Sequence, residues 1–303
     1  MTTIKNKALP LLLLILISTL SFSCKKKKQD ADSFTFAFLT DIHLQPEKNA
    51  TEGFMKAIDT LNILKPDFVI TGGDLIMDAL AQKETRADSL YQLYKEVSGK
   101  LGMPVYNTMG NHEIFGIYEK SGIDPSHPLY GEKMFEARIG KRYYAFNHGG
   151  WRFYILDSID EREDRQGYYG HIDSLQLEWI REDLKTVDKN TPLVISVHIP
   201  MISVQAQIDN GATAANGEGS VITNSKKVLD LFANHKLKLV LQGHLHYLED
   251  IYASGTHFIT GGAVSASWWN GPIGDLQEGF LLLKVKGDEF DWEYIDYGWE
   301  VKG

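Results

Sequence analysis

Short apolar runs alternate with segments of helical periodicity over the first third of the chain. Apolar side chains recur at helical spacing from Phe54 to Leu64, just before Pro66, and again from Leu90 to Val97. The apolar runs around them predict strands at 34–39, 67–70 and 104–109. This β-α-β-α-β order is typical of a mainly parallel sheet that is covered by helices.

The second half of the chain adds two hairpins and further strand and helix units. His148-Gly149-Gly150 separates two apolar runs and predicts a hairpin turn, as does Gly287-Asp288 near the end. An amphipathic helix is expected from Leu175 to Leu184, with Asp173 and Ser174 as candidate caps. The other predicted elements are strands at 193–197 and 237–241, a helix at 224–234 and a long loop at 203–220. No repeat or internal linker interrupts this order, so we expect one folded domain.

The composition argues against some classes of protein. The chain has 303 residues and a net charge of −9, and this negative charge argues against a nucleic-acid partner. An anionic substrate is compatible with it, because a bound metal ion can dominate the local electrostatic field. The single cysteine, Cys24, rules out an intrachain disulfide.

The N-terminal segment has the pattern of an export signal. Lys5 and Lys7 precede an apolar stretch at 8–20, which is too short for a comfortable membrane span. Cys24 follows this stretch and resembles the lipid-acceptor cysteine of a bacterial lipoprotein. We therefore expect a signal peptide at 1–23, membrane attachment through a lipidated Cys24, and a tether at 24–32. The expected location is the bacterial cell envelope, either the periplasm or the outer membrane.

Two features of this segment depart from the lipoprotein pattern. Leu20 lies four residues before Cys24, where lipoprotein signals place a leucine three before. The four lysines at 25–28 disfavour export, because positive charge tends to stay in the cytoplasm. An uncleaved anchor and an ordinary cleaved signal are therefore the alternatives.

Polar side chains with ligand chemistry follow several predicted strands. Because the carboxyl ends of parallel strands meet at one edge of a sheet, we expect these side chains to converge. In extended backbone, residues two apart face the same way, so Asp41 would face the same way as His43, and His244 the same way as His246. Carboxylate, amide and imidazole groups bind borderline divalent metals, so the set predicts a metal site. Its members are Asp41 and His43, Asp74, Asn111, His198, and His244 and His246, with His112 beside them but set apart from the ligands.

The ordered motifs resemble those of the calcineurin-like metallophosphoesterase family. They are Asp41-Ile42-His43, Gly73-Asp74, Gly110-Asn111-His112-Glu113, His198 and Gly243-His244-Leu245-His246. The resemblance implies an α/β fold over a domain at 33–303, namely a four-layer α/β/β/α sandwich of mixed sheets flanked by helices. It also implies two divalent metal ions, with Mn, Fe, Zn and Ni all compatible. One metal would be held by Asp41, His43, Asp74 and His246, and the other by Asp74, Asn111, His198 and His244.

The donor set implied by this resemblance suits the hydrolysis of phosphate esters. Two divalent cations carry more positive charge than Asp41 and Asp74 offset, so the centre attracts a phosphate. A hydroxide that bridges the metals would be the nucleophile, and His112 would be the general acid for the leaving group. A purely structural role for His112 is the alternative. We expect Glu113 to support the site rather than to bind metal, and Gly110 to permit a sharp turn.

Departures from related families narrow the substrate class. In protein serine/threonine phosphatases, Asp-Arg-Gly follows the Gly-Asp pair, and this continuation is absent after Gly73-Asp74. Asp78 is nevertheless a candidate to orient His112. Purple acid phosphatases place a tyrosine ligand where Leu75 and Ile76 stand. The chain looks more similar to the bacterial branch of class III cyclic-nucleotide phosphodiesterases and general phosphoesterases. We therefore expect hydrolysis of phosphate mono- or diesters, with a small molecule or a lipid as substrate.

Two segments are candidates for substrate contacts. Two other functions are alternatives to the hydrolysis of phosphate esters. The segments are the loop at 203–220 and Ser265–Pro272, whose tryptophans would either form an aromatic wall over the metals or pack against the surface. A nuclease is disfavoured by the negative charge. A metal-binding or interaction protein that has lost catalysis is disfavoured because every expected ligand and His112 are present.

Overall fold

The computed structural model describes residues 33–301 of the chain. The expected signal peptide, the lipidated Cys24 and the tether at 24–32 lie outside the described residues. No helix within the described part is long and apolar enough to cross a bilayer.

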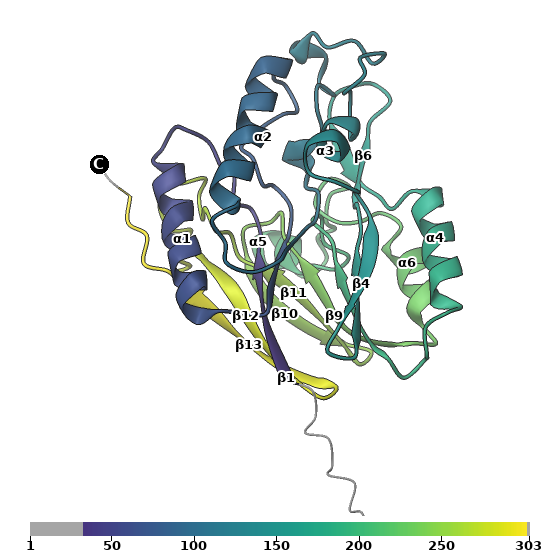
Figure 1. Cartoon of the computed structure of the whole chain (residues 1–303). Coiled ribbons are helices and arrows are strands. Elements are labelled where there is room, and N and C mark those ends of the chain that lie inside the picture. Colours follow the sequence, from purple (N-terminus) through teal and green to yellow (C-terminus); the bar gives the residue numbers. More distant parts are fainter. Residues whose placement is uncertain (1–32, 302–303) are drawn as a thin grey trace, which may run out of the picture. The chain divides into compact units, whose positions relative to one another are not determined.

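Two mixed β-sheets form the centre of the fold (Figure 1). The first sheet has the order β13 (Glu289–Asp296), β12 (Gly279–Lys286), β1 (Ser33–Leu39), β2 (Phe68–Thr71) and β3 (Val105–Asn107). The second has the order β10 (Leu248–Ala253), β11 (Thr256–Gly261), β9 (Lys236–Gln242), β8 (Pro192–Ser196), β5 (Trp151–Ile155) and β4 (Tyr144–His148). The strands β1, β2 and β3 run parallel in the first sheet, as do β5, β8, β9 and β11 in the second. The remaining neighbours pair antiparallel.

Helices cover the two outer sides of this pair of sheets (Figure 1). On one side lie α1 (Ala50–Leu64) and α2 (Glu84–Ser98), and on the other lie α4 (Ser174–Leu184) and α6 (Ser225–Phe232). The short helices α3 (Lys133–Arg138) and α5 (Gln205–Asn210) belong to the connecting segments. The layers therefore follow the expected α/β/β/α order. The parallel pairing expected for the first three strands is confirmed. The later strands β5, β8, β9 and β11 belong to a second sheet, so the expectation that all donor-bearing strands share one sheet edge is wrong.

The apolar alternation of β1 explains how one strand serves two layers. Phe36 and Phe38 belong to the aromatic core between the sheets, whereas Ala37 and Leu39 belong to the core under the helices. In the inter-sheet core, the ring centroids of Phe36 and Phe68 lie 5.1 Å apart and stack. Successive side chains of β1 thus pack alternately into the core between the sheets and the core under the helices, which makes this strand central to the packing.

Most local predictions agree with the structure. Gly149 and Gly150, with φ of 52° and 79°, form the predicted hairpin turn between β4 and β5. Asp173 caps α4 by accepting a hydrogen bond from the Gln176 N–H at 2.8 Å. Leu64, the last member of the predicted apolar stripe of α1, is 41% exposed, because the helix ends there with Lys65 in a left-handed conformation.

Three segments differ from the prediction in their secondary structure. The loop expected at 203–220 contains α5, none of whose residues is buried. The pattern also did not reveal the hairpin of β10 and β11, whose first strand alternates weakly and exposes Tyr252. A small ribbon of β6 (Ile159–Glu161) and β7 (Tyr168–Gly170) was likewise missed, because three-residue strands carry almost no periodic signal.

Candidate metal centre

The loops that follow five strands meet at one end of the two sheets. Three of these strands belong to the first sheet and two to the second, so the site lies where the sheets face each other and not on the rim of a single sheet. The structure brings all eight predicted residues together, and only His112 and His244 are partly exposed. Asp41 and His43 follow β1, Asp74 follows β2, Asn111 and His112 follow β3, His198 follows β8, and His244 and His246 follow β9.

One group of donors surrounds Asp41. The Nε2 atoms of His43 and His246 lie 3.0 Å apart, and the Nε2 of His246 lies 3.3 Å from Asp41 Oδ1. The Nε2 of His43 is also 3.6 Å from Asp74 Oδ2. These four residues offer two imidazoles and two carboxylates to a single point.

A second group lies on the other side of Asp74. The Nε2 of His198 is 3.2 Å from Asp74 Oδ2 and 3.0 Å from Asn111 Oδ1. His244 completes a cluster with Asp74 and His198, in which the donor atoms all lie within 4.8 Å of one another. Asp74 is therefore shared by the two groups.

The orientation of the imidazoles tests whether these groups fit cations. His198 donates its Nδ1–H to the Gly72 carbonyl at 2.8 Å, and His246 points its Nδ1 at the Ala266 carbonyl. In a neutral ring this leaves a lone pair on each Nε2, and those atoms face carboxylate oxygens, the Asn111 oxygen or another ring nitrogen. The Nδ1 of His43 is buried and has no partner in the described chain. Buried acceptors that face each other need positive charge between them, so divalent cations fit both groups.

The protein also sets the protonation of these groups. Burial raises the pKa of Asp41, but His246 and His198 outweigh it and bring that pKa down to about 2. Burial opposes ionisation of Asp74 as well, yet His198 and His112 hold its pKa well below the usual range. Burial and the neighbouring histidines lower the pKa of His43 strongly and that of His244 to about 4. Both carboxylates are thus ionised and these two imidazoles neutral at pH 7, as metal ligation requires.

The pKa values of the other two histidines, His198 and His246, are raised rather than lowered. Burial lowers the pKa of His198, but the carboxylates of Asp74 and Asp41 outweigh it and raise that pKa to about 9. Asp41 likewise raises the pKa of His246 despite its burial. In the metal-free chain, protons on these rings supply the positive charge that the acceptors need, and metal binding would displace them.

Five of the eight side chains stand on left-handed backbone. Asp41, His43, Asp74, His244 and His246 have φ between 46° and 73°. This region is uncommon for residues other than glycine, and such strain clusters at functional sites. The two-residue spacing of Asp41 and His43 therefore brings them together through left-handed backbone, and the extended geometry expected from the sequence is wrong. His244 and His246 do not face the same group of donors at all.

Glu113 fixes the loop that carries Asp74. Its Oε2 accepts the N–H groups of Asp74 at 2.9 Å and Gly110 at 2.7 Å, and its Oε1 accepts those of Leu75 and Ile76 at 2.8 and 3.1 Å. Burial and the Asp74 charge raise the pKa of Glu113 to about 8. Since each oxygen already accepts two N–H groups, a proton on either one would face donors only, so the hydrogen bonds oppose protonation. Glu113 thus supports the site, as the sequence suggested.

Gly110 is required for a different reason from the predicted one. Its φ of −108° and ψ of 179° are extended and open to any residue, so no sharp turn depends on it. A Cβ at this position would lie 2.2 Å from the Asp74 backbone nitrogen and 2.3 Å from its Oδ1. The glycine therefore allows the third loop to approach the shared carboxylate closely.

A residue that the sequence did not single out orients Asp41. The hydroxyl of Thr40 donates to Asp41 Oδ2 at 2.6 Å, and the backbone N–H of His244 donates to the same oxygen at 3.0 Å. A Cβ on Gly243 would lie 1.9 Å from Thr40 Oγ1, so this glycine makes room for the hydroxyl. The only signal in the sequence was the position of Thr40 directly before the first ligand.

His112 lies at the mouth of the site, beside the shared carboxylate. Its side chain is 20% exposed, and its Nε2 lies 3.8 Å from Asp74 Oδ2. The backbone N–H of His112 donates to Asp74 Oδ1 at 2.9 Å, and its Nδ1 faces the Met77 carbonyl. The expectation that Asp78 orients this ring is wrong, because Asp78 instead accepts from the Leu80 N–H and from the Gln82 side chain.

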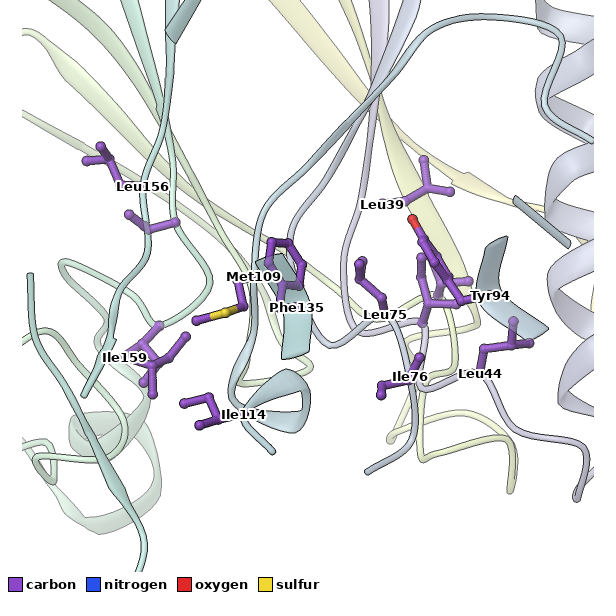
Figure 2. Close-up of a cluster of buried hydrophobic side chains, with 14 of the residues drawn as sticks. Leu39, Leu44, Leu75, Ile76, Tyr94, Met109, Ile114, Phe135, Leu156 and Ile159 are labelled. Carbon is purple, nitrogen blue, oxygen red and sulfur yellow. The ribbon is translucent and has the colours of Figure 1, made fainter. Parts of the chain in front are cut away.

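Buried apolar side chains next to the donors attach these loops to the core. Leu75 and Ile76 directly follow Asp74, Met109 precedes Gly110, and Ile114 follows Glu113; all are at most 2% exposed. Figure 2 shows these side chains along the segments that carry the donors, and all four belong to one apolar cluster. The donors are therefore attached to packed core, which limits their movement.

The sequence comparison decides the family. A family model for calcineurin-like phosphoesterases matches residues 34–248. The chain belongs to the calcineurin-like phosphoesterase family. Over 267 residues, this phosphoesterase is 26% identical to the 3′,5′-cyclic-nucleotide phosphodiesterase of Nostoc sp. (strain PCC 7120 / SAG 25.82 / UTEX 2576), with 83% of this chain and 88% of the relative covered. The chain is thus a metallophosphoesterase with a candidate dimetal site of aspartate and histidine residues.

Solved structures agree on the fold. A dimetal phosphatase from Danio rerio is 15% identical, with a TM-score of 0.57 over 88% of this chain and 99% of that one. A purple acid phosphatase from yellow lupin (Lupinus luteus) seeds is 19% identical, with a TM-score of 0.60 over 88% of this chain and 52% of that one. At these identities the likeness concerns the fold alone, and the four-layer sandwich of mixed sheets is confirmed.

We predict that Glu113→Gln weakens the metal centre of this phosphoesterase. The new amide would turn N–H donors towards two of the four backbone N–H groups, which costs about 1–3 kcal/mol of stability. Metal affinity should fall by roughly 10- to 100-fold, as expected for a support of a ligand. Urea unfolding and metal titration measure the two effects. The exposed Glu96→Gln on α2 is the control, and equal behaviour of the two variants would contradict the supporting role.

Proposed function

We propose that this metallophosphoesterase hydrolyses phosphate mono- or diesters of small molecules, with diesters as the first substrates to test. The observation that carries the proposal is Asp74, a buried carboxylate shared by two donor groups with His112 beside it. The curated relative named as a 3′,5′-cyclic-nucleotide phosphodiesterase supports the choice of diesters. Lipid esters remain within the same reaction class.

The chain's own residues would position and polarise the ester. Bound between the proposed ligands, two divalent cations would supply an activated, bridging hydroxide and positive charge for the phosphate. Asp41, His43, Asp74 and His246 are the proposed ligands of one cation, and Asp74, Asn111, His198 and His244 those of the other. Asp74 fixes the distance between the two groups, and its second oxygen holds the backbone of His112.

His112 is the proposed general acid. Its ring is held by the Met77 carbonyl at Nδ1, which leaves Nε2 directed to the side of Asp74 and available to a leaving oxygen. Partial exposure of the ring lets it exchange protons with water after each turnover. A nuclease finds less support, because the net charge of −9 opposes a nucleic-acid backbone.

Loss of the shared carboxylate tests the proposal directly. Asp74→Asn should lower metal stoichiometry below two per chain and reduce hydrolysis of bis-p-nitrophenyl phosphate and p-nitrophenyl phosphate by at least about 100-fold. Metal analysis and initial rates, with and without chelator, measure this. Asp291→Asn, an exposed site on β13, is the control. Wild-type protein that is folded and metal-loaded but turns over neither ester would overturn the proposal and favour a metal-binding protein without catalysis.

The leaving group reveals the role of His112. In His112→Asn, hydrolysis of a diester with an alkyl alcohol leaving group should fall by about 10²- to 10⁴-fold, because an alkoxide needs a proton. The p-nitrophenyl ester should lose far less, since its phenolate leaves without one. Rates for the matched esters, with His257→Asn on β11 as the control, separate the cases. Equal losses for both leaving groups would assign His112 a structural role.

We also propose that the chain acts in the bacterial cell envelope as a lipoprotein. The support is the N-terminal pattern, in which the only cysteine follows the apolar stretch. Cys24→Ser should abolish incorporation of labelled fatty acid and move the protein out of the membrane fraction. If the wild type carries no lipid, or if the serine variant stays in the membrane, the segment is an ordinary signal or an anchor.

A further inference from the structure

Two adjacent tryptophans in the loop after β11 have opposite environments. Trp269 is 1% exposed, and its indole N–H lies 3.0 and 3.1 Å from the carbonyls of Ile42 and His43. A Cβ on Gly53 of α1 would lie 2.2 Å from this indole, so the helix has no side chain there. Trp269 therefore anchors the loop to the backbone of the segment that carries Asp41 and His43, the first two proposed ligands.

The loop around these tryptophans is fixed in an unusual conformation. Ala266, Trp268 and Trp269 have φ of 41°, 50° and 67°, a region that bulky residues adopt rarely. The Ser265 hydroxyl donates to the Asp41 carbonyl at 2.8 Å, and the Ala266 carbonyl faces His246 Nδ1. Such backbone persists only where the surroundings determine it, and here the surroundings are the metal ligands themselves.

This conformation places Trp268 directly over one group of donors. Its ring centroid lies 4.4 Å from that of His246 and 5.9 Å from that of His43. The side chain is nonetheless 41% exposed. Within residues 33–301, its indole N–H has no hydrogen-bond partner, and the aromatic rings that it contacts are those of the two histidines. A large flat surface is thus held at the rim of the site and left open.

We infer that Trp268 is a specificity-determining residue that stacks on a planar aromatic group of the phosphate ester, such as a nucleobase. The inference rests on the proposed function, because the phosphate must be held beside Asp74. Stacking on an indole suits any base, since every base has a π face, whereas a sugar or an alkyl chain offers none. His43 and His246, which lie against the indole, are themselves proposed metal ligands. An organic group on a phosphate bound at the metals therefore lies within reach of the Trp268 ring. The contact therefore selects esters that carry an aromatic ring.

A matched pair of ligands isolates this contact. Adenosine 5′-monophosphate and ribose 5-phosphate differ only in the base, and calorimetric titration of the metal-loaded protein gives both affinities. We expect the nucleotide to bind roughly 5- to 100-fold more tightly to the wild type. Trp268→Leu should reduce the nucleotide to the level of the sugar phosphate and leave the sugar phosphate unchanged. Trp268→Phe should retain part of the preference.

A second tryptophan provides the control. Trp292 lies on β13 and donates its indole N–H to Asp250, so Trp292→Phe should keep the full preference. Nucleotide binding should quench indole fluorescence in the wild type and in Trp292→Phe, and this quenching should be lost in Trp268→Phe. A full preference in folded Trp268→Leu would overturn the inference and leave the proposed function intact. If neither ligand binds the metal-loaded wild type, phosphate capture itself fails, and the proposed function falls together with the inference.

Discussion

Burial of acceptor groups around Asp74 is the constraint on which the site depends. Its carboxylate faces His43 at 3.6 Å on one side and His198 at 3.2 Å on the other, in surroundings that exclude water. Burying a charge without a partner costs on the order of several kcal/mol, so this arrangement is stable only when positive charge is supplied. The chain supplies it through protonated imidazoles or through bound cations. Affinity for cations is thus the direct consequence of how the donors are buried.

Hydrogen bonds and close packing hold Asp74 and its neighbours in fixed positions, as catalysis requires. Glu113 binds four backbone N–H groups around Asp74, and Gly110 lets the neighbouring loop approach it. Because the backbone of His112 is held by Asp74 itself, the proposed acid and the proposed shared ligand cannot move independently. Errors of a fraction of an ångström matter in such sites, which explains why the supporting groups are as specific as the ligands.

The order of the donors along the chain was predictable, because each follows an apolar strand that is visible in the sequence. The division of the strands between two sheets was not, since it depends on pairings such as β1 with β12 that join residues far apart in the chain. The left-handed backbone at Asp41 and Asp74 was also beyond prediction, because tertiary contacts impose it against local preference. For the same reason, the sequence could not tell which of Trp268 and Trp269 is buried and which is open.

The pairing of β1 has a consequence for how the protein matures. This strand lies between β2 and β12, and Phe34 pairs with Val285, which is far away in the sequence. During synthesis from the N-terminus, the strand that precedes Asp41 and His43 lacks one of its two neighbours until β12 has been made. Contacts of such long range close slowly and late. All the proposed donors, the last of which is His246, are therefore made before the first sheet can be completed, and the support of the site is completed later than its ligands.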